Sequence, residues 1–369
     1  MLDPVELART LVSFRTDDPR TGDDACAGHT AGLLERLGFE VHRQRFGAGR
    51  MNVVARLVGE DASAPALAMT GHLDTVPLGA AAWSVDPFGG EIREGRLFGR
   101  GTSDMKAGVA AMISAAAEGR ARPRRRGLVL VLTDSEETGA QGALALVAGA
   151  DDRIGRACGL VVGEPTANRI AVGHKGCLCL RARFRGVTAH SAMPELGVNA
   201  IYKAARAITS VEAVRLDYPH DSLLGDPTIN VGTVSGGLNT NSVPDFAEFT
   251  IDLRSTAQSP HADLRRRMFT CLGAEAEVET VIDMPAIATD ATDPFVRMAM
   301  AASGETAPGA AVFYTDASVL QPHLRCPTII LGPGEPAMAH QTDEYCEVGH
   351  ITEAHGIYAR MIHEVCEVG

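Results

Sequence analysis

The sequence predicts an α/β protein in which a discontinuous, mostly parallel-sheet domain is interrupted by an inserted α+β domain. On both sides of the middle of the chain, short apolar runs alternate with helical segments, which favours a parallel sheet covered by helices on both faces. In the middle of the chain, apolar and polar residues alternate one by one, as in strands with one solvent-exposed face. We therefore expect the larger domain over residues 1–175 and 285–369, and the inserted domain over residues 176–284.

The elements of the larger domain follow from capping signals and apolar periodicity. Asp3, Pro4 and Glu6 form an N-cap, a first-turn proline and a capping-box glutamate, which predict a helix that ends near Val12. Further helices are expected over residues 25–37, 109–117 and 293–302, from about residue 315, and over about 351–365. Strands are expected over residues 39–45, 52–58, 66–70, 128–132, 160–163 and 328–331.

The inserted domain shows a different pattern. Between Cys177 and Arg185, apolar residues such as Leu178 and Phe184 alternate with arginines, which predicts a strand with one face in solvent. There follow a helix over 199–214, strands over 228–234 and 246–254, a helix opened by Ser259 and Pro260, and a strand over 276–282. The order β-α-β-β-α-β is that of a ferredoxin-like domain.

Composition argues against several classes of protein. The 369 residues are enough for two domains with substantial cores, and a net charge of −12 argues against a nucleic-acid or anionic-membrane partner. No apolar run approaches the ~20 residues that span a bilayer, and the start of the chain does not resemble a secretory signal. The eight cysteines are scattered, so we expect them to be reduced and mostly buried. These observations favour a cytoplasmic protein.

Ionisable side chains follow the expected strands or lie on a glycine-flanked loop that enters a helix. They are His72, Asp74, Asp104, Glu136, Glu137, Glu164 and His340. Taken alone, each has an ordinary explanation as a solvated loop residue or a helix cap. Ligands of open α/β sheets, however, bind just beyond the carboxyl ends of the strands, so the group is a candidate site. Neighbours such as Glu136 and Glu137 point to opposite sides of an extended segment, which favours different roles for the two.

Five motifs occur along the chain: GHLDTVP at 71–77, GRGTSDMKAG at 99–108, EETG at 136–139, GEPT at 163–166 and AHQTDE at 339–344. On these motifs the chain resembles the dinuclear zinc metallopeptidase family that contains acetylornithine deacetylase, succinyl-diaminopimelate desuccinylase, aminoacylase and carboxypeptidase G. The similarity spans nearly the whole chain. The segments FYTDAS at 313–318 and GPGEPAMAHQTDE at 332–344 look most similar to the acetylornithine deacetylase and desuccinylase branch.

The resemblance implies a site for two Zn²⁺ ions, with Co²⁺ or Mn²⁺ as possible substitutes. His72 and Glu164 would bind one ion, Glu137 and His340 the other, and Asp104 would bridge them. Two imidazoles and three carboxylates are ligands that suit these metals. A water that bridges two such ions can have its pKa lowered to about 7, which makes hydroxide available at neutral pH.

The resemblance also implies roles for two residues beside the ligands. Asp74 would orient His72, and Glu136 would be the general base. A carboxylate beside a ligand can take the proton of the attacking water and pass it to the leaving amine. The peptide bond between Asp104 and Met105 is expected to be cis, as in relatives.

In the inserted domain, the resemblance implies that His190 reaches the active site of a partner subunit and contacts the scissile carbonyl. The functional unit would then be a homodimer formed through this lid and dimerisation domain. Arg254 would clamp the α-carboxylate of the substrate, for which its planar fork is suited. Asn241, Lys175 and the backbone of Gly332 are further candidates for contacts with substrate. Taken alone, His190 is equally well explained as an exposed loop histidine.

The function that the resemblance implies is hydrolysis of the amide bond of an N-acyl amino acid, as by the deacetylase of arginine biosynthesis. One alternative is a dipeptidase or carboxypeptidase of the same family, which would use the same metals and the same arginine. Another is a non-catalytic relative that binds an acyl amino acid or a protein partner. Such a relative would be expected to have lost a ligand or the base, but all five ligand positions and Glu136 are present.

Overall fold

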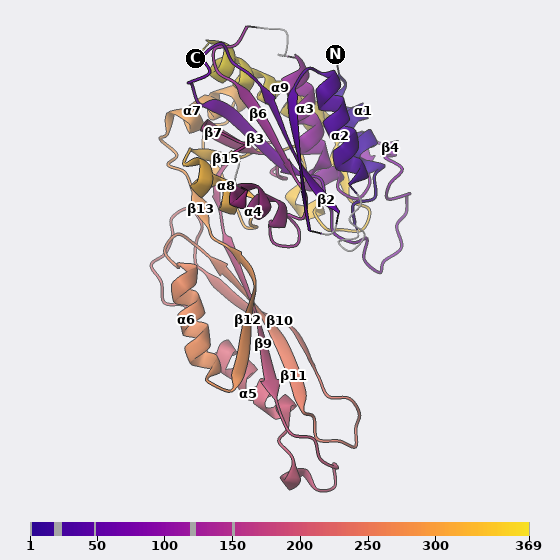
Figure 1. Cartoon of the computed structure of the whole chain (residues 1–369), viewed down its shortest axis with the longest axis vertical. Helices are drawn as coiled ribbons and strands as arrows, with labels where there is room; N and C mark the ends of the chain where they lie inside the picture. Colours follow the sequence, from indigo (N-terminus) through magenta and orange to yellow (C-terminus); the bar gives the residue numbers. More distant parts are fainter. Residues whose placement is uncertain (1, 18–23, 48, 119–122, 150–151, 369) are drawn as a thin grey trace. The chain divides into compact units, whose positions relative to one another are not determined.

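The computed structural model describes residues 2–17, 24–47, 49–118, 123–149 and 152–368 of the chain (Figure 1). The chain divides into two compact units. The first consists of Met1–Gly173, Ala288–Ala311 and Thr315–Gly369, and the second of His174–Ile287 and Val312–Tyr314. In the sequence, the second unit is therefore an insertion in the first.

Among the described residues, a nine-stranded sheet in the order β1-β2-β6-β3-β7-β15-β8-β13, with β14 paired to β8, forms the centre of the first unit. Its strands are β1 (Glu40–Phe46), β2 (Arg50–Leu57), β3 (Ala66–His72), β6 (Leu128–Thr133), β7 (Ala157–Val162), β8 (Ala171–His174), β13 (Ile287–Ala288), β14 (Gly309–Ala311) and β15 (Thr328–Ile330). The four central strands β6, β3, β7 and β15 are parallel, whereas β1 with β2, β2 with β6, and β15 with β8 pair antiparallel. The predicted α/β fold around a mostly parallel sheet is confirmed.

Burial shows that the central strands are covered on both sides. Every residue of β3 and of β6 is buried. Because neighbouring side chains of a strand point to opposite faces, both faces of the sheet are covered at these strands. This explains why residues 128–132 form a continuous apolar run rather than an alternating one.

Helices supply this cover. They are α1 (Pro4–Val12), α2 (Ala25–Arg36), α3 (Ala107–Glu118), α4 (Gln141–Ala148), α7 (Pro294–Ser303), α8 (Ala317–Leu324) and α9 (Val348–Ile362). Helices α1, α3 and α9 pack against one another (Figure 1), whereas α4 packs against α8 and against β1 and β2. Asp3 caps α1, since its carboxylate accepts hydrogen bonds from the N–H groups of Val5 (2.8 Å) and Glu6 (3.4 Å).

Two glycines allow a close approach at the carboxyl end of β7. A Cβ at Gly108, in the first turn of α3, would lie 2.2 Å from the carbonyl oxygen of Gly163. A Cβ at Gly332, just after β15, would lie 2.1 Å from the same oxygen. No side chain fits at such distances, so only glycine lets α3 and the loop after β15 meet at this strand end.

A small sheet of β4 (Ile92–Arg93), β5 (Arg96–Phe98) and β16 (Tyr345–Glu347) was not expected from the sequence. Its strands have two or three residues, which is too short for a periodic apolar signal. Strand β16 pairs antiparallel with β5. The pairing brings the segment before β16, which carries His340, beside the loop after β5, which leads to Asp104.

The second unit contains a four-stranded antiparallel sheet in the order β10-β11-β9-β12. Its elements are β9 (Gly176–Arg185), α5 (Ala200–Glu212), β10 (Thr228–Gly236), β11 (Phe246–Ser255), α6 (His261–Leu272) and β12 (Ala276–Met284). The predicted β-α-β-β-α-β order is confirmed. Leu178 and Phe184 of β9 lie in an apolar core with residues of α5 and α6, while Arg181 and Arg183 form ion pairs with Glu279 on the strand β12.

The remaining features are short turns and the cysteines. Short helical turns lie at Thr102–Lys106, Pro194–Leu196, Pro336–Met338 and His363–Val368. All eight cysteines are free thiols and five of them are buried, as predicted. Within the described ranges, no helix is both long and apolar enough to cross a membrane.

Candidate active site

The candidate residues of the first unit come from the ends of neighbouring strands. His72 is the last residue of β3, the pair Glu136 and Glu137 follows β6, and Glu164 follows β7. These strands are adjacent and parallel, so their carboxyl ends meet at one edge of the sheet. His340 comes from the loop after β15, which is the next strand in the order.

Asp104 lies between two imidazoles. Its Oδ1 is 3.0 Å from Nε2 of His72, and its Oδ2 is 3.3 Å from Nε2 of His340. Asp104 lies in the segment before α3, where its own backbone is not helical (φ −122°, ψ 93°), and the peptide bond to Met105 is cis, as the resemblance implied. One carboxylate thus faces two different histidines, one with each oxygen.

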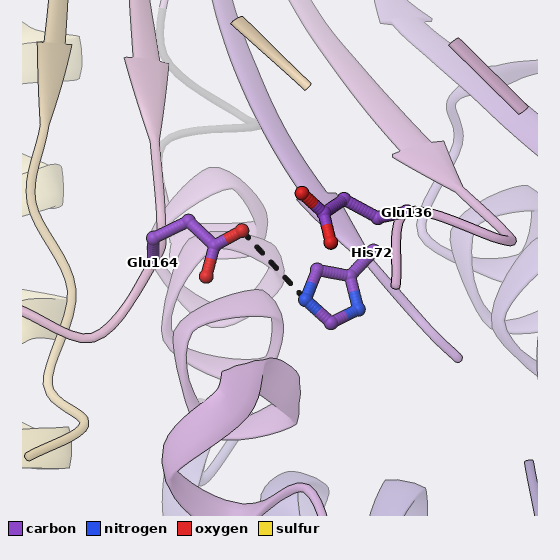
Figure 2. A group of neighbouring side chains, drawn as sticks. All are labelled: His72, Glu136 and Glu164. Carbon is purple, nitrogen blue, oxygen red and sulfur yellow. Dashed lines mark ion pairs between the residues drawn. The ribbon is translucent and has the colours of Figure 1, made fainter. Parts of the chain in front are cut away.

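On one side of Asp104 lies a group that we call the buried half, which consists of His72, Glu164 and Glu136. Nε2 of His72 is 3.7 Å from Oε1 of Glu164, and Figure 2 shows Glu136 beside both side chains. One ligand atom from each of the three residues lies within 4.8 Å of the others. The side chains of His72 and Glu164 are only 1% and 5% exposed, so both are almost completely buried.

On the other side lies the open half, which consists of His340 and Glu137. Nε2 of His340 is 3.1 Å from Oε2 of Glu137, and the side chain of His340 is 52% exposed. Ligand atoms of Glu137, Asp104 and His72 also lie within 4.8 Å of one another, which joins the two halves. The structure therefore brings together the five side chains that the resemblance assigns to metal binding.

Asp74 contacts His72 through its main chain and the Glu136–Glu137 pair through its side chain. Nδ1 of His72 is 2.9 Å from the backbone oxygen of Asp74 but 3.5 Å from its carboxylate. A carbonyl oxygen only accepts, so Nδ1 donates, and in a neutral ring the lone pair lies on Nε2, the atom that faces Asp104. The Asp74 carboxylate accepts hydrogen bonds from the backbone N–H groups of Glu136 and Glu137, both at 3.2 Å. This second function of Asp74 was not apparent from the sequence.

Negative charge is concentrated at this strand edge. Burial, together with the charge of Glu164, raises the pKa of Glu136 well above its ordinary value, and burial with the charge of Asp104 does the same to the pKa of Glu164. Burial and Asp104 also raise the pKa of Glu137. A raised carboxyl pKa means that the anion is destabilised where it lies, so the site favours added positive charge.

The two imidazoles are held where positive charge is stabilised. Burial alone would lower the pKa of His72, but the charge of Glu164 and the hydrogen bond to Asp104 raise it well above the ordinary value. Hydrogen bonds to Asp104 and Glu137 raise the pKa of His340 to about 10. Protons or metal ions bound at these nitrogens can supply the positive charge that stabilises the carboxylates.

The donor set and its spacing suit divalent transition-metal ions. Imidazole nitrogens and carboxylate oxygens are ligands of Zn²⁺, and Co²⁺ and Mn²⁺ bind the same types. Two ligands about 2.1 Å from one tetrahedral ion lie about 3.4 Å apart. The pair His72 and Glu164 is 3.7 Å apart, and the pair His340 and Glu137 is 3.1 Å apart. Residues able to hold a metal are therefore present in both halves.

One buried carboxylate near the site had no role in our sequence analysis. Asp316, which precedes α8, is 2% exposed and accepts a hydrogen bond from the hydroxyl of Thr133 at the end of β6. Burial raises the pKa of Asp316 to about 6, and its charge contributes to the raised pKa values of Glu136 and Glu164. An aspartate before a helix is usually an N-cap, so the sequence pattern alone did not single it out.

In the second unit, the structure places His190 beside Asn241. His190 forms an isolated β-bridge with Ser242, and the N–H of Ser191 donates to the backbone oxygen of Asn241 at 3.0 Å. The His190 side chain lies on an exposed segment, where its Nδ1 accepts from the N–H of Ala192 at 3.1 Å. A neutral His190 ring in this position carries its proton on Nε2, which makes that atom a hydrogen-bond donor.

The two basic candidates of the second unit have partners within that unit. Arg254 lies near the end of β11, and its Nε and Nη2 donate to the two carboxylate oxygens of Asp252 at 2.8 and 3.0 Å. Nζ of Lys175 donates to the backbone oxygen of Asp226 at 2.6 Å. Asp252 therefore fixes the plane of the Arg254 guanidinium, a contact that the sequence did not predict.

Gly332, the remaining candidate, lies in the first unit, where its main chain already has partners. Its N–H donates to the hydroxyl of Thr166 at 3.1 Å, and its oxygen accepts from the N–H of Asn168 at 2.8 Å. A contact between the N–H of Gly332 and a substrate would require the bond to Thr166 to break. The structural reason for glycine here is the close approach to Gly163.

Carboxylates and imidazoles gathered at the strand ends of an α/β sheet are typical of metal-dependent hydrolases. Comparison with known proteins agrees with that class. The model of peptidase family M20/M25/M40 matches residues 68–364, and the chain belongs to this family. The chain is therefore a hydrolase, and the resemblance inferred from its motifs is confirmed.

Curated relatives include both enzymes of the branch indicated by the sequence. The chain is 32% identical over 377 residues to the acetylornithine deacetylase of Myxococcus xanthus, and this match covers 98% of this chain and 95% of that protein. It is 33% identical over 389 residues to the succinyl-diaminopimelate desuccinylase of Rhodospirillum centenum, and this match covers 98% of this chain and 96% of that protein.

Solved structures similar to this one include peptidases. Aminopeptidase PepT of Bacillus cereus matches with a TM-score of 0.72 and 27% identity, over 98% of both chains. An M20 family metallo-carboxypeptidase of Sulfolobus solfataricus matches with a TM-score of 0.83, over 98% of this chain and 99% of that one. At 16% identity, the second match shows a common fold alone.

Proposed function

We propose that the chain is a two-metal amide hydrolase that removes the acyl group of an N-acyl amino acid and releases a carboxylate and a free α-amine. The observation that supports this most directly is the position of Asp104, whose two oxygens face His72 and His340 separately. A carboxylate in this position can bridge two ions. The proposed metal is Zn²⁺, with Co²⁺ or Mn²⁺ as substitutes.

In this proposal each half of the site holds one ion. His72 and Glu164 are the ligands in the buried half, His340 and Glu137 are those in the open half, and Asp104 is shared. When bound, the ions would supply Lewis-acid polarisation of the amide carbonyl and a hydroxide nucleophile at neutral pH. The carboxylates, whose raised pKa values mark destabilised anions, would in turn be stabilised.

Glu136 is the proposed general base. It is 5% exposed, and Asp74 fixes its backbone N–H, so its carboxylate has a defined place beside His72 and Glu164. A carboxylate held in this place, beside the ligands but not one of them, can take a proton from water and return it to the leaving group. Glu136 takes a proton from the attacking water as the new C–O bond forms, and gives it to the amine nitrogen as the C–N bond breaks.

The second unit would supply the groups that bind the substrate. Nε2–H of His190, from the partner subunit of a homodimer, would donate to the scissile carbonyl oxygen as it becomes negative. Arg254, held by Asp252, would bind the α-carboxylate through the outer edge of its guanidinium. Asn241, which lies beside His190, and Lys175 are proposed to add polar contacts.

The homodimer is supported by the surface of the second unit. Strand β10 is at the edge of its sheet, where backbone groups are open to pairing with another strand. Apolar side chains are exposed on β10, on the turn after it and on the adjacent helix α5: Val234 is 64% exposed, Leu238 91%, Ile201 39% and Tyr202 64%. Exposed apolar side chains on an edge strand and on the helix that packs against it are groups that an interface between two proteins would bury.

The substrate within the class is the finer part of the proposal. The similarity to acetylornithine deacetylase and to succinyl-diaminopimelate desuccinylase, at about a third of positions, favours an N-acetyl or N-succinyl derivative of a basic amino acid. Arginine biosynthesis would be the corresponding pathway in the first case. The alternative is a short peptide, which the 27% identity to aminopeptidase PepT supports. Both substrates present an amide for the same chemistry.

Turnover on a panel of substrates tests the proposal. Protein loaded with Zn²⁺ or Co²⁺ is incubated with N-acetyl, N-succinyl and N-formyl amino acids and with dipeptides, and products are detected by mass spectrometry, with Glu136→Ala as the blank. Hydrolysis of one acyl amino acid above the others is the expected result. Preference for peptides would support the alternative, and no hydrolysis by protein with both metals bound would contradict catalysis on either class.

A further inference from the structure

A buried glutamate connects the loop that carries Asp104 to the loop that carries His340. Glu344 lies four residues after His340, just before β16, and is 0% exposed. Glu344 is the last residue of the motif AHQTDE at 339–344, and the motif alone indicates no function for it. A carboxylate so deeply buried is costly unless hydrogen-bond donors surround it, so its contacts show what it does.

Four donors converge on the Glu344 carboxylate. Its Oε1 accepts from the backbone N–H groups of Ser103 (2.8 Å) and Asp104 (3.0 Å). Its Oε2 accepts from the N–H of Gly101 (2.9 Å) and from Nη1 of Arg100 (2.6 Å). Three backbone amides of the Asp104 loop therefore bind one side chain from the His340 loop.

Arg100 extends this network to a third loop. Its Nη1 also donates to the backbone oxygen of Gln341, and its Nη2 donates to the backbone oxygen of Pro77, both at 3.3 Å. Pro77 follows His72 along the chain, and Gln341 follows His340. The pair of Arg100 and Glu344 thus joins the segment after His72 to the loops that carry Asp104 and His340.

The main chain strengthens the link between Glu344 and the Asp104 loop. The backbone oxygen of Glu344 accepts from the N–H of Gly99 at 2.9 Å, and the hydroxyl of Ser103 donates to the backbone oxygen of Tyr345 at 2.6 Å. Asp104 itself, by contrast, directs its carboxylate towards the two imidazoles. Glu344 therefore holds the backbone of Asp104 and leaves the carboxylate of Asp104 for the site.

We propose that Glu344 is a positioning residue that sets where Asp104 lies between the two halves of the site, and so sets how tightly the shared carboxylate binds two metal ions. This inference rests on the proposed two-metal function. It adds a residue that contacts neither substrate nor metal. Partners that orient a ligand in this way typically change metal affinity by about ten- to a hundredfold when they are removed.

The test compares Glu344→Gln with a matched control in the same small sheet. Glu347 in β16 forms an ion pair with Arg96 of β5 at 2.8 Å, but both side chains are partly exposed (32% and 42%). Glu347→Gln therefore removes an ion pair from the sheet without touching the Asp104 loop. Glu344→Asp is the second variant, because it keeps the charge opposite Arg100 while its shorter side chain cannot reach all three amides.

Two measurements are made on the full-length protein. Titration of metal-free protein with Co²⁺, followed by visible absorption, gives the affinities and the ligand field of the bound ions. Amide hydrogen exchange of the metal-free protein reports on the N–H groups of Gly101, Ser103 and Asp104. We expect Glu344→Gln to weaken binding of Co²⁺ by about ten- to a hundredfold, to alter the absorption bands and to speed exchange at these amides. Glu347→Gln should match the unaltered protein in all three.

The outcomes separate this inference from the proposed function. If the unaltered protein binds two Co²⁺ and Glu344→Gln binds them with the same affinity and spectrum, the inference is wrong and the two-metal function stands. If the unaltered protein binds no metal, the proposed function is wrong. If, in addition, Glu344→Gln leaves hydrogen exchange at the three amides unchanged, the positioning role is wrong as well. If Glu344→Gln does not fold, Glu344→Asp decides, with weaker Co²⁺ binding expected and unchanged binding contradicting the inference.

Discussion

The two halves of the candidate site differ sharply in how the fold supports them. In the buried half, His72 and Glu164 come from the ends of adjacent parallel strands and are 1% and 5% exposed. In the open half, His340 lies on a loop, with a φ of 64° and a side chain that is 52% exposed. Each half places a histidine and a glutamate beside Asp104. What differs is the element that carries the histidine, a strand end or a loop, and the exposure of that histidine to water.

This difference predicts different properties for two bound ions. Side chains fixed at strand ends lose little freedom when they bind a metal, and a closed site exchanges its ligands slowly. A histidine on an exposed loop must be ordered on binding, which costs conformational entropy. We therefore expect the buried half to hold its ion more tightly, and the open half to exchange ions and to admit substrate.

The largest effect is expected from the pair Glu136 and Glu137, which are neighbours in sequence but belong to different halves. Glu136→Gln removes the proposed base and should lower kcat by about 10²–10⁴-fold while the protein still binds two metal ions. Glu137→Gln should instead release the ion of the open half. Steady-state kinetics and metal analysis on both variants test this. Equal loss of metal in the two variants would contradict the division of roles.

A second effect separates the two histidines. His340→Ala should retain about one equivalent of metal after dialysis against a weak chelator, because the buried half is intact. His72→Ala removes a ligand from the tighter half and should retain less, with an affinity for the first ion lower by about a hundredfold or more, since removal of an outer partner alone costs 10–100-fold. If His72→Ala retained more metal than His340→Ala, burial of the ligands would not determine the metal affinity of this site.

A smaller effect is expected at Asp74. Its carboxylate accepts from the N–H groups of both Glu136 and Glu137, and Asp74→Asn replaces one of these acceptors by a donor. Metal affinity should fall by about ten- to a hundredfold. The main-chain bond to His72 should persist, because the substitution leaves the backbone oxygen in place. Calorimetric titration with Zn²⁺ measures the loss, and an unchanged affinity would assign Asp74 to packing alone.

The smallest effect concerns the stability of the metal-free protein as pH changes. The pKa of His340 is raised from about 6.5 to about 10, so its stabilisation is fully present below about pH 6.5 and is lost as pH rises to about 10. The raised pKa values of Glu136 and Glu164 act in the same direction, because the folded state favours their protonated forms. Tm of the metal-free protein should therefore fall by a few degrees across this range.

Metal should remove most of this dependence, because bound cations replace the protons. The control is the metal-loaded protein, whose Tm is measured in the same buffers so that the titration of other groups cancels. A metal-free protein whose Tm rises with pH, relative to the loaded one, would contradict the assigned pKa shifts.

Comparison of the sequence analysis with the structure shows why some features could be predicted and others not. The strands that end at His72 or just before Glu136 and Glu164 were predictable because buried parallel strands leave continuous apolar runs, and their carboxyl ends mark the site. Which half each residue belongs to depended on the resemblance. Spacing along the chain does not specify which strand ends are neighbours in the sheet.

The supporting contacts could not be predicted because they depend on tertiary geometry. Nothing in a local pattern distinguishes Glu344, which binds three backbone amides, from the partly exposed Glu347 three residues later. The strands β5 and β16, which bring Glu344 to its partners, have only three residues each. The second role of Asp74 likewise depends on backbone N–H groups, which carry no sequence signal.

The central claim is that Asp104 is shared by two metal ions, one in each half. Crystals of the Co²⁺-loaded protein, measured at the cobalt absorption edge, test it directly, because anomalous scattering locates the ions without reference to any other density. We expect two anomalous peaks, one beside His72 and Glu164 and one beside His340 and Glu137, with Asp104 between them. A single peak in one half, or bound cobalt away from Asp104, would contradict the account.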